Sequence, residues 1–382
     1  MQCPHRPPCP GCPRFGEPGI VPTVRDALTA LARAQRLPPL EIVEGQALGY
    51  RHRARLAIRG RATSPKVGIF QEGSHRITDV PRCVVHHPLV NDVAAAVKRS
   101  VRRTGVTLYG DTSHRGLLRY LQVVVERATT TAQVVLVAND ETPEALATTA
   151  DAVRAELGPR LHSLWWNGNT TTTNAILGPR WHRWTGPETT CETIGGARVY
   201  YPPGAFGQAN LPLADRIVAL VHGWVPPGAR VLEMHAGVGA IGLGLVARGH
   251  EVVFNEVSRF SLVGLNLGID ALGHEARRRT EVRRGPAANH LGAIADADVV
   301  ICDPPRRGLE APLLARLAAD PPRRLILVSC DPDAFLNEAR TLLQNRAIRL
   351  SALVPFALFP FTEHVETVAL FERSGRSSML VP

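Results

Sequence analysis

The second half of the chain, from about residue 208, alternates short apolar segments with Ala- and Leu-rich stretches, and this alternation restricts the fold more than any other feature. Strands that alternate with helices form a parallel sheet covered by helices on both faces, which is an open, doubly wound α/β domain. The segments that we expect to be strands are 230–234, 251–255, 298–303, 324–329 and 367–372. Ligands of such domains bind at the carboxyl ends of the strands, so we expect the functional residues there.

The first half of the chain has a different pattern, which predicts a central, mostly β (α+β) domain. Alternating or β-branched residues predict strands, and Ala-rich stretches predict helices near 91–103 and 143–157. The expected strands are 53–58, 66–70, 120–126 and 133–137. We therefore divide the chain into three parts. Residues 1–92 hold a Cys-rich segment and the start of the central domain, 93–200 hold the rest of that domain, and 201–382 form the α/β domain.

Composition and charge narrow the class of protein. The chain has 382 residues, of which 45% are hydrophobic and 20% charged, and this excludes wholesale disorder and a fibrous repeat. No apolar run reaches the roughly 18 residues that cross a bilayer, and the N-terminus does not resemble a secretion signal. We therefore expect a cytoplasmic protein without a membrane partner. The net charge of +10 favours an anionic partner, with nucleic acid as the first candidate.

The seven cysteines are unevenly distributed, which favours metal binding over disulfides in a chain without a secretion signal. Cys3, Cys9 and Cys12 have the spacing C-x5-C-x2-C, and Cys83 is the fourth candidate ligand. Four thiolates suit either tetrahedral zinc or an iron–sulfur cluster, and spacing alone does not decide between them. Cys191 and Cys302 fit no ligand pattern, so we expect them to be ordinary core thiols.

A glycine-rich turn follows the first strand of the α/β domain, and glycine lets the backbone approach a ligand closely. Strand 231–234 leads into the sequence His-Ala-Gly-Val-Gly-Ala-Ile-Gly, which contains His235 and Gly237. About 20 residues further on, Glu256 ends the next strand, where an acid accepts hydrogen bonds from ribose hydroxyls. These features favour S-adenosylmethionine over a dinucleotide or ATP, since the dinucleotide glycine spacing and a phosphate-binding Gly-Lys-Ser/Thr loop are missing. A tight turn without a ligand is the alternative.

Two further strand ends, and the segment before the last expected strand, carry groups that suit a methyl transfer. Asp303 precedes two prolines, whose extended exit from the sheet directs it to the same cleft. Cys330 directly follows the expected strand 324–329; it is either a packing residue or a nucleophile. A thiolate that adds to carbon 6 of uracil makes carbon 5 able to attack a sulfonium methyl group. The base that then removes the carbon 5 proton is Glu363 or Glu366, and the residues alone do not separate them.

These motifs, in this order, resemble the RNA uracil-5-methyltransferases, which use S-adenosylmethionine to form 5-methyluridine. The resemblance covers nearly the whole chain, and its most specific blocks are Asp303-Pro-Pro-Arg, Ser329-Cys330 and 359–366. It implies that Cys330 is the nucleophile and Glu366 the proton acceptor. It also implies that the residues contacting the cofactor are Gln208, His235, Gly237, Glu256 and Asp303.

The resemblance also suggests a cluster and a substrate. It implies a [4Fe-4S] cluster on Cys3, Cys9, Cys12 and Cys83 with a structural or RNA-contacting role, and zinc remains the alternative. Because the chain starts near its first cysteine, we expect it to lack the extra N-terminal β-barrel of longer members. That layout resembles the short bacterial members that act on 23S rRNA. The alternatives are the transfer-RNA T-loop, a DNA or protein amide methyltransferase, and a non-catalytic RNA-binding relative. No obligate protein partner is implied.

Four residues depart from the family pattern: Gly207, Glu233, His235 and Asp331. An acid directly after Cys330 should disfavour its thiolate.

Alternating arginines in 50–62 suggest how RNA is held. In a strand, odd positions share one face, which gives a basic stripe of Arg51, Arg53, Arg55, Arg59 and Arg61. The residues that could extend it are His75, Arg76, Arg102, Arg103, Arg115 and Arg119, and a merely solvated face is the alternative. An extruded uracil would lie beside Phe206 or Phe361. Trp165 and Trp166 are either stacking platforms or core residues.

Overall fold

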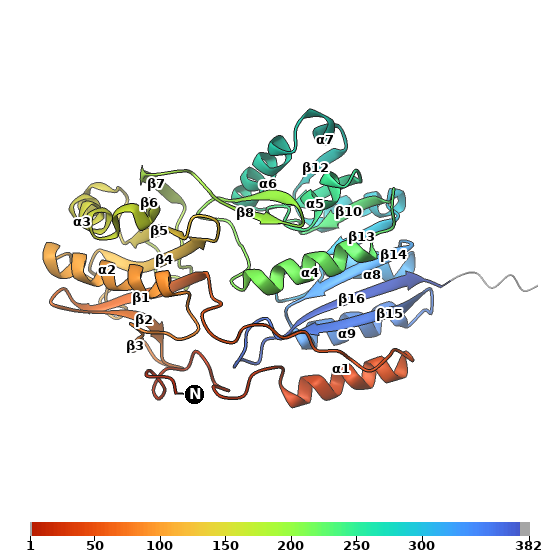
Figure 1. Cartoon of the computed structure of the whole chain (residues 1–382), viewed down its shortest axis with the longest axis horizontal. Coiled ribbons are helices and arrows are strands. Elements are labelled where there is room, and N and C mark those ends of the chain that lie inside the picture. The colour runs from red at the N-terminus through yellow and green to blue at the C-terminus, as the bar shows by residue number, and fades with distance from the viewer. Residues whose placement is uncertain (1, 375–382) are drawn as a thin grey trace, which may run out of the picture. The chain divides into compact units, whose positions relative to one another are not determined.

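The computed structural model describes residues 2–374 of the chain, which form two compact units. The described residues of unit 1 are 2–17, 46–192 and 200–211, and those of unit 2 are 18–45, 193–199 and 212–374. Each unit contains one seven-stranded sheet (Figure 1). A separate two-stranded sheet consists of β8 (Thr190–Ile194) and β9 (Ala197–Tyr201).

Unit 1 is built on a mostly antiparallel sheet in the order β3-β2-β1-β4-β5-β6-β7. Its strands are β1 (Arg53–Arg61), β2 (Ser64–Phe70), β3 (Ile77–Asp79), β4 (Leu118–Glu126), β5 (Thr131–Ala138), β6 (Leu161–Gly168) and β7 (Arg180–Thr185). The pair β5–β6 is parallel, and the chain between them forms the crossover that such a pair needs. That crossover contains α3 (Ala147–Leu157) between the short 3₁₀ helices Glu144–Leu146 and Gly158–Arg160.

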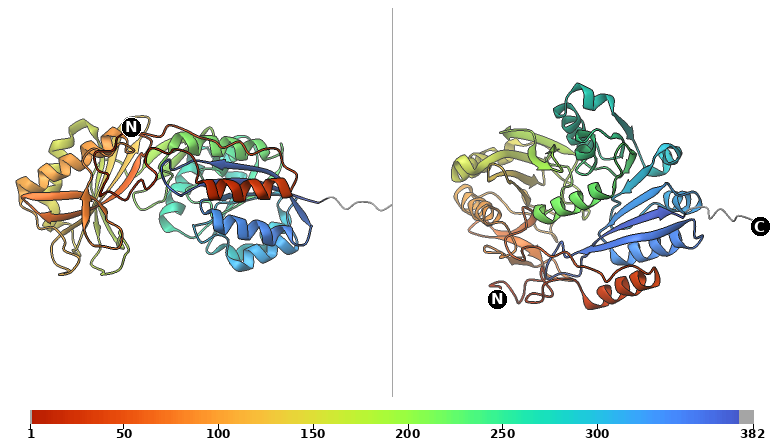
Figure 2. Two further views of the ribbon diagram at one scale, coloured as in Figure 1. Left: turned by 90° about the horizontal axis from the view of Figure 1, so that it is seen from below. Right: turned by 45° about the vertical axis from the view of Figure 1, so that its right-hand side comes forward.

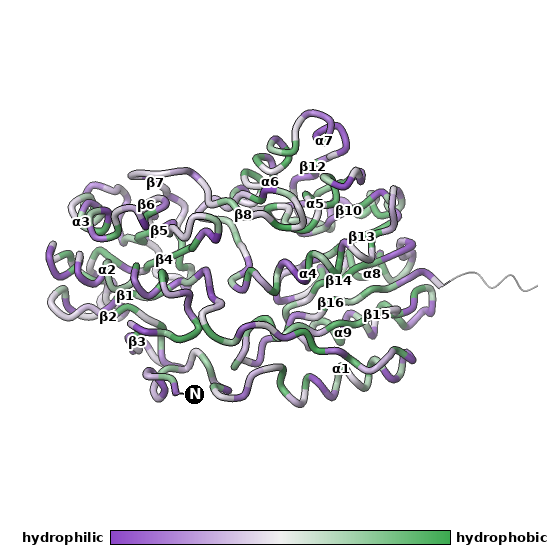
Figure 3. Tube along the Cα trace, in the orientation of Figure 1, coloured by the Kyte–Doolittle hydropathy of each residue, from purple (hydrophilic) through white to green (hydrophobic). Residues whose placement is uncertain are grey.

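The core of unit 1 lies between the sheet and two helices, α2 (Pro88–Thr104) and α3, which pack on each other. Strand residues of alternating position, such as Leu121, Val123 and Val125, join apolar residues of both helices in one buried cluster. The expected strands and helices of this half of the chain are all present. Figure 3 shows the apolar character of buried strands such as β5.

Unit 2 has the sheet order β12-β11-β10-β13-β14-β16-β15. Its strands are β10 (Arg230–Met234), β11 (Glu251–Glu256), β12 (Thr280–Arg284), β13 (Val299–Cys302), β14 (Arg324–Ser329), β15 (Ile348–Phe356) and β16 (Glu366–Arg373). The five strands from β12 to β14 are parallel, whereas β16 runs antiparallel to both of its neighbours. The α/β expectation is therefore confirmed, but segment 367–372 is not a parallel strand.

Helices lie on both faces of this sheet (Figure 2). They are α1 (Pro22–Ala34), α4 (Leu211–Trp224), α5 (Gly242–Ala247), α6 (Arg259–Ala271), α7 (His274–Arg278), α8 (Ala311–Ala319) and α9 (Pro332–Leu343), with a 3₁₀ segment at Ala287–Asp296. One apolar cluster joins α1, α8 and α9 to the strand residues on one face. In residues 2–374, no helix is both long enough and apolar enough to span a membrane.

Candidate functional site

The carboxyl edge of the unit 2 sheet gathers five of the predicted site residues. Four of them follow or end a parallel strand: His235 follows β10, Glu256 ends β11, Asp303 follows β13 and Cys330 follows β14. The fifth, Glu366, begins the antiparallel strand β16. The antiparallel pairing of β14 with β16 places Ser329 opposite Thr367. Because of this register, the end of β14 and the start of β16 meet at one edge, which brings Cys330 and Glu366 together.

The glycine-rich turn holds the carboxylate of Glu256. Gly237 adopts φ 58°, in the left-handed region that favours glycine, and its N–H donates to Glu256 Oε2 at 2.7 Å. The other oxygen, Oε1, accepts hydrogen bonds from the N–H groups of Val257 and Ser258. A Cβ atom added at Gly237 would meet open space. The turn therefore presents an oriented carboxylate beside an unfilled volume.

His235 contributes an unsatisfied polar atom next to this turn. Its backbone also lies in the left-handed region, with φ 58°. Within the described part of the chain, its buried Nδ1 has no hydrogen-bond partner. Burial lowers the pKa of the imidazole, against the opposing effect of Glu310 and Glu256. A neutral histidine with a free buried nitrogen is suited to bind a polar ligand.

Glu233 lies beneath the turn as a structural carboxyl group. It is 1% exposed, and its Oε2 accepts a hydrogen bond from Gly242 N–H at 3.0 Å. A Cβ atom on Gly242 would stand 2.2 Å from that oxygen, so this position requires glycine. Burial and the neighbouring Asp303 raise the pKa of Glu233 well above its usual range. We find Glu233 joined to the turn rather than open to a ligand.

Cys330, Glu366, Asp303 and Arg306 form one electrostatic cluster. The pKa of the Cys330 thiol is raised to about 11, first by burial and then by the charges of Glu366 and Asp303, and Arg306 opposes this rise. Glu366 is 2% exposed, and burial followed by Asp303 raises its pKa well above the usual range. Burial raises the pKa of Asp303 to about 7. Because charge is costly at this edge, the cluster is poised to gain and lose protons.

Glu366 and Glu363 differ sharply in their surroundings. Glu363 is exposed to solvent, whereas Glu366 is buried at the sheet edge, and its Oε1 lacks a hydrogen-bond partner among residues 2–374. The residue sequence did not separate these two acids. Their burial separates them, and Glu366 is the charge that raises the pKa of Cys330 most.

Asp331 caps helix α9, so the raised pKa of the Cys330 thiol needs another explanation. Its Oδ1 accepts the N–H of Ala334 at 2.9 Å, as an N-cap residue of α9 does. The expected rise in the pKa of Cys330 is present. Its first causes are burial, Glu366 and Asp303 rather than Asp331.

The sequence analysis assigned no role to two residues of this site, Arg306 and Glu338. Glu338 is 4% exposed on α9, and its Oε1 accepts the Leu309 N–H at 2.5 Å. A signal was present, because Glu338 occupies the same helix face as the buried Phe335 and Leu342. An acid on an apolar helix face is unusual and indicates a specific partner.

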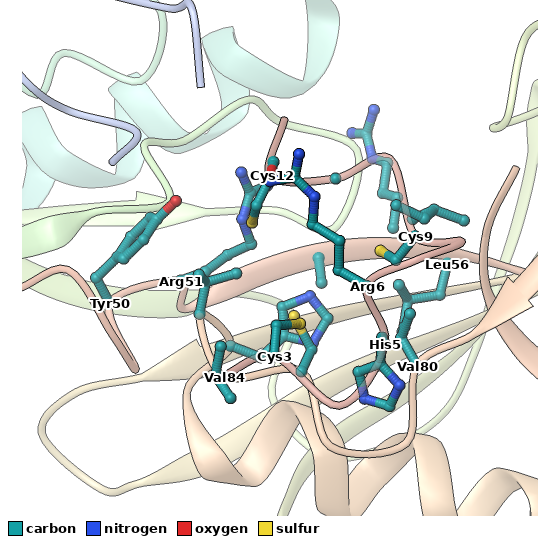
Figure 4. Close-up of a pocket in the computed structure, with 17 residues that line it drawn as sticks. Cys3, His5, Arg6, Cys9, Cys12, Tyr50, Arg51, Leu56, Val80 and Val84 are labelled. Atoms are coloured by element: carbon teal, nitrogen blue, oxygen red, sulfur yellow. The ribbon is translucent and has the colours of Figure 1, made fainter. Parts of the chain in front are cut away.

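The four N-terminal candidate ligands share a cavity in unit 1 (Figure 4). Cys3, Cys9, Cys12 and Cys83 line a volume of about 200 Å³. The pKa of Cys12 is raised to about 11, first by burial and then by the three other thiols. Among the described residues, no group of three or more His, Cys, Asp or Glu side chains is arranged to hold a metal ion. The thiols thus share one cavity without being drawn into a metal-binding geometry.

Gln208 belongs to unit 1, unlike the other predicted cofactor residues. It lines a small cavity of that unit with His52, Arg53 and Tyr201. The geometry of unit 2 alone therefore does not bring Gln208 to the edge that carries His235.

Two of the arginines predicted to contact RNA are internal: Arg59 of the basic stripe, and Arg119 of the residues that could extend it. Arg59 is 7% exposed and forms a bidentate pair with Asp111, with both N–O distances at 2.7 Å. Arg119 is 3% exposed and donates to the carbonyls of Asn169 and Thr171. Exposed positions remain for an RNA surface: Arg55, Arg61, His75, Arg76, Arg102, Arg103 and Arg115.

The aromatic residues that were candidates for stacking on a base differ in their exposure to solvent. Phe361 is fully buried, so it cannot stack on a base as it lies. Phe206 is 70% exposed and remains available. Trp166 belongs to the core of unit 1, whereas Trp165 is half-buried, with the Arg183 guanidinium 5.8 Å from its ring centre.

Comparison with known proteins gives consistent matches. The family model described as tRNA (Uracil-5-)-methyltransferase matches residues 290–374. An uncharacterized RNA methyltransferase of Protochlamydia amoebophila is 33% identical over 381 residues, covering 98% of both chains. Another, from Parasynechococcus marenigrum, is 31% identical and covers 87% of this chain and 72% of its own.

A solved structure shares the fold. It is the Pyrococcus abyssi tRNA (uracil-54, C5)-methyltransferase in complex with S-adenosyl-L-homocysteine, with a TM-score of 0.78 and 23% identity. The match covers 95% of this chain and 84% of that one.

Proposed function

Since this chain belongs to the RNA uracil-5-methyltransferase family, we propose that it methylates carbon 5 of one uridine in 23S rRNA, with S-adenosylmethionine as methyl donor. The observation that carries this proposal is the meeting of Cys330 and Glu366 at the carboxyl edge of the unit 2 sheet. A thiol and a buried acid at one edge are the two groups that uracil-5 chemistry needs. Such an enzyme would work in the cytoplasm.

The residues of unit 2 that would hold the methyl donor are His235, Gly237, Glu256 and Asp303. Three features of the described residues fit an adenosine group: the open space at Gly237, the unpartnered Nδ1 of His235 and the fixed carboxylate of Glu256. A carboxylate oxygen can accept two hydrogen bonds, so Oε2 of Glu256, which accepts the Gly237 N–H, retains a lone pair for a ribose hydroxyl. When bound, S-adenosylmethionine supplies an electrophilic methyl group.

The covalent steps follow from the positions of Cys330 and Glu366. The Cys330 thiolate forms a bond from Sγ to carbon 6 of the uracil, and the electron pair of the carbon 5–carbon 6 double bond becomes an enolate. Carbon 5 then attacks the methyl group as the methyl–sulfur bond breaks, which leaves S-adenosylhomocysteine. Glu366 accepts the proton of carbon 5, the double bond forms again, and Cys330 departs as a thiolate.

Burial equips Glu366 for the last step. A carboxylate with a raised pKa is a stronger base than an exposed one, and it is most effective when its pKa approaches the working pH. Because Arg306 lowers the pKa of both Cys330 and Glu366, we assign it the role of favouring the two ionised forms. Glu363 faces solvent and has no part in this scheme.

Transfer RNA is the second candidate substrate. It is favoured by the description of the matching family model and by the substrate named for the Pyrococcus abyssi enzyme. The N-terminal cysteines favour 23S rRNA, through the resemblance to the short cluster-bearing members. In either case the substrate would be bound by unit 1, whose exposed arginines provide phosphate contacts.

We also propose that Cys3, Cys9, Cys12 and Cys83 hold a [4Fe-4S] cluster. The support is that all four thiols line one cavity and have no other assigned role. The cluster would supply a cross-link for the N-terminal segment, because the methyl transfer needs no electron. Iron and acid-labile sulfide at four atoms each per anaerobically purified chain would support the cluster. One zinc atom per chain, without sulfide, would overturn it.

The experiment that tests the reaction uses transcribed 23S rRNA fragments, transfer RNA and a labelled methyl donor. The expected result is 5-methyluridine in the rRNA, none with Cys330→Ala, and a denaturation-resistant protein–RNA adduct with Glu366→Gln. Labelling of transfer RNA alone would correct the substrate and keep the mechanism. Full activity of Cys330→Ala would overturn the mechanism itself.

A further inference from the structure

The turn that follows β13 is fastened to the helix that follows Cys330. Gly308 N–H donates to the carbonyl of Pro305 at 2.8 Å, which closes the turn. The next N–H, that of Leu309, donates to Oε1 of Glu338 at 2.5 Å. Glu338 lies in the second turn of α9, whose first residue comes two positions after Cys330. One buried hydrogen bond therefore links two segments that both carry residues of the candidate site.

The turn and the carboxyl group of Glu338 are also in close steric contact. Gly308 adopts φ 80°, and a Cβ atom added there would stand 2.3 Å from Oε1 of Glu338. Only glycine fits between the turn and this carboxyl group. Leu309, directly after it, is buried in the main apolar cluster of unit 2. The position of the turn is thus fixed by a hydrogen bond and by steric fit on the same oxygen atom.

The fixed turn carries Arg306. Its Nη2 lies 3.4 Å from Nε2 of His364, on the segment that leads to Glu366. Its charge lowers the pKa of both Cys330 and Glu366. The effect of one charge on another depends on their separation, so a shift of the turn would change the ionisation of both groups.

We infer that Glu338 is a positioning residue for the proposed methyl transfer, because its bond to the Leu309 N–H holds the turn that places Arg306 beside Cys330 and Glu366. This inference rests on the proposed function. Glu338 acts through the turn and touches no reacting atom.

The carboxyl group of Glu338 has chemistry that a glutamine can copy. Burial raises its pKa, with Asp331 adding to the effect and the Leu309 N–H opposing it. In residues 2–374, its Oε2 has no hydrogen-bond partner, so the second oxygen is not needed as an acceptor. Glu338→Gln keeps the acceptor for Leu309, whereas Glu338→Leu keeps similar volume and removes the acceptor.

The reactivity of the Cys330 thiol reports on the position of Arg306 independently of methylation. The charged groups that act on this thiol are Glu366 from β16, and Asp303 and Arg306 from the segment after β13. If the turn moves, Arg306 favours the thiolate less, and alkylation of Cys330 at a given pH becomes slower. Iodoacetamide labelling, followed by mass spectrometry of the peptide that contains Cys330, measures this rate.

The test compares four proteins: wild type, Glu338→Gln, Glu338→Leu and Asp333→Asn, which removes an exposed acid from the same helix. We expect Glu338→Leu to slow Cys330 alkylation at pH 9 by about threefold or more and to lower kcat at least tenfold. The KM for RNA should change less than about threefold. Glu338→Gln and Asp333→Asn should match the wild type. Equal damage from the Gln and Leu variants, or none from Leu, would overturn the inference.

Two further variants keep the inference falsifiable if Glu338→Leu fails to fold. Gly308→Ala pushes the turn away from the intact carboxyl group and should slow alkylation in the same way. In an Arg306→Met background, Gly308→Ala should slow it no further, because the shared intermediary is gone. An additive effect would contradict the role of Arg306. If Cys330 of the wild type is alkylated at the expected rate but the protein methylates no RNA, the proposed function is wrong, while the effect of Glu338 on Cys330 through Arg306 still stands.

Discussion

Replacing Glu366 by Gln should change the two activities of the site in opposite directions. The substitution preserves shape and removes the proposed base, so turnover should fall by about 10² to 10⁴, which is about 3 to 5 kcal/mol in barrier height. The same change removes the first of the charges that raise the pKa of Cys330. If that pKa falls from about 11 by one unit, the thiolate fraction at pH 9 rises about tenfold.

The assay measures turnover with labelled S-adenosylmethionine and the alkylation rate of the Cys330 peptide in the same preparations. Glu363→Gln is the matched control, because Glu363 is exposed three residues away and should leave both quantities unchanged. In the wild type, turnover should rise with pH between 7 and 10, because both the thiol and the acid must lose protons and both have raised pKa values. Loss of turnover in Glu363→Gln with normal Glu366→Gln would refute the assignment.

Three further predictions concern stability and the neighbour of the nucleophile. Gly242→Ala should lower the free energy of unfolding, measured by chemical denaturation, by about 1 to 3 kcal/mol, because the added methyl group overpacks against a buried carboxyl oxygen. Gly223→Ala is the control, since its added methyl group meets open space and should not destabilise the protein. Asp331→Asn should retain the helix cap and alter the rate of Cys330 alkylation less than about twofold, whereas Asp331→Ala should lower the free energy of unfolding by about 1 kcal/mol. A large change of the alkylation rate in Asp331→Asn would show that Asp331 does influence the pKa of the thiol. Asp111→Ala should destabilise by about 3 to 5 kcal/mol, since it leaves the buried Arg59 guanidinium unpaired; a near-normal melting temperature would show the pair to be dispensable.

Within the sheet of unit 2, the sequence predicted the strands that have neighbours on both sides. In unit 2 these are β10, β11, β13, β14 and β16, each a run of apolar residues. The two missed strands, β12 and β15, are the edges of the sheet. Of the five residues of β12, three are charged, because an edge strand remains partly solvated and needs no apolar run. The direction of β16 was also missed, since a strand's composition carries no record of its orientation.

Some residues of the site could also be predicted from the sequence, and others could not. Cys330 and Asp303 could be found because Cys330 directly follows a predicted strand and Asp303 ends one. Glu366 and Glu363 could not be separated, because burial depends on how β16 pairs with β14. Arg59 was misassigned, since alternation predicts which face a side chain occupies but not what covers it. Its partner Asp111 lies 52 residues away in the chain.

The measurement that tests the central claim most directly is mass spectrometry of nucleosides from separated ribosomal and transfer RNA of a strain that lacks the gene. The account predicts that 5-methyluridine disappears from 23S rRNA, that the wild-type gene restores it, and that the Cys330→Ala gene does not. If both RNA pools keep their 5-methyluridine after deletion, or if Cys330→Ala restores it, the proposed function is contradicted.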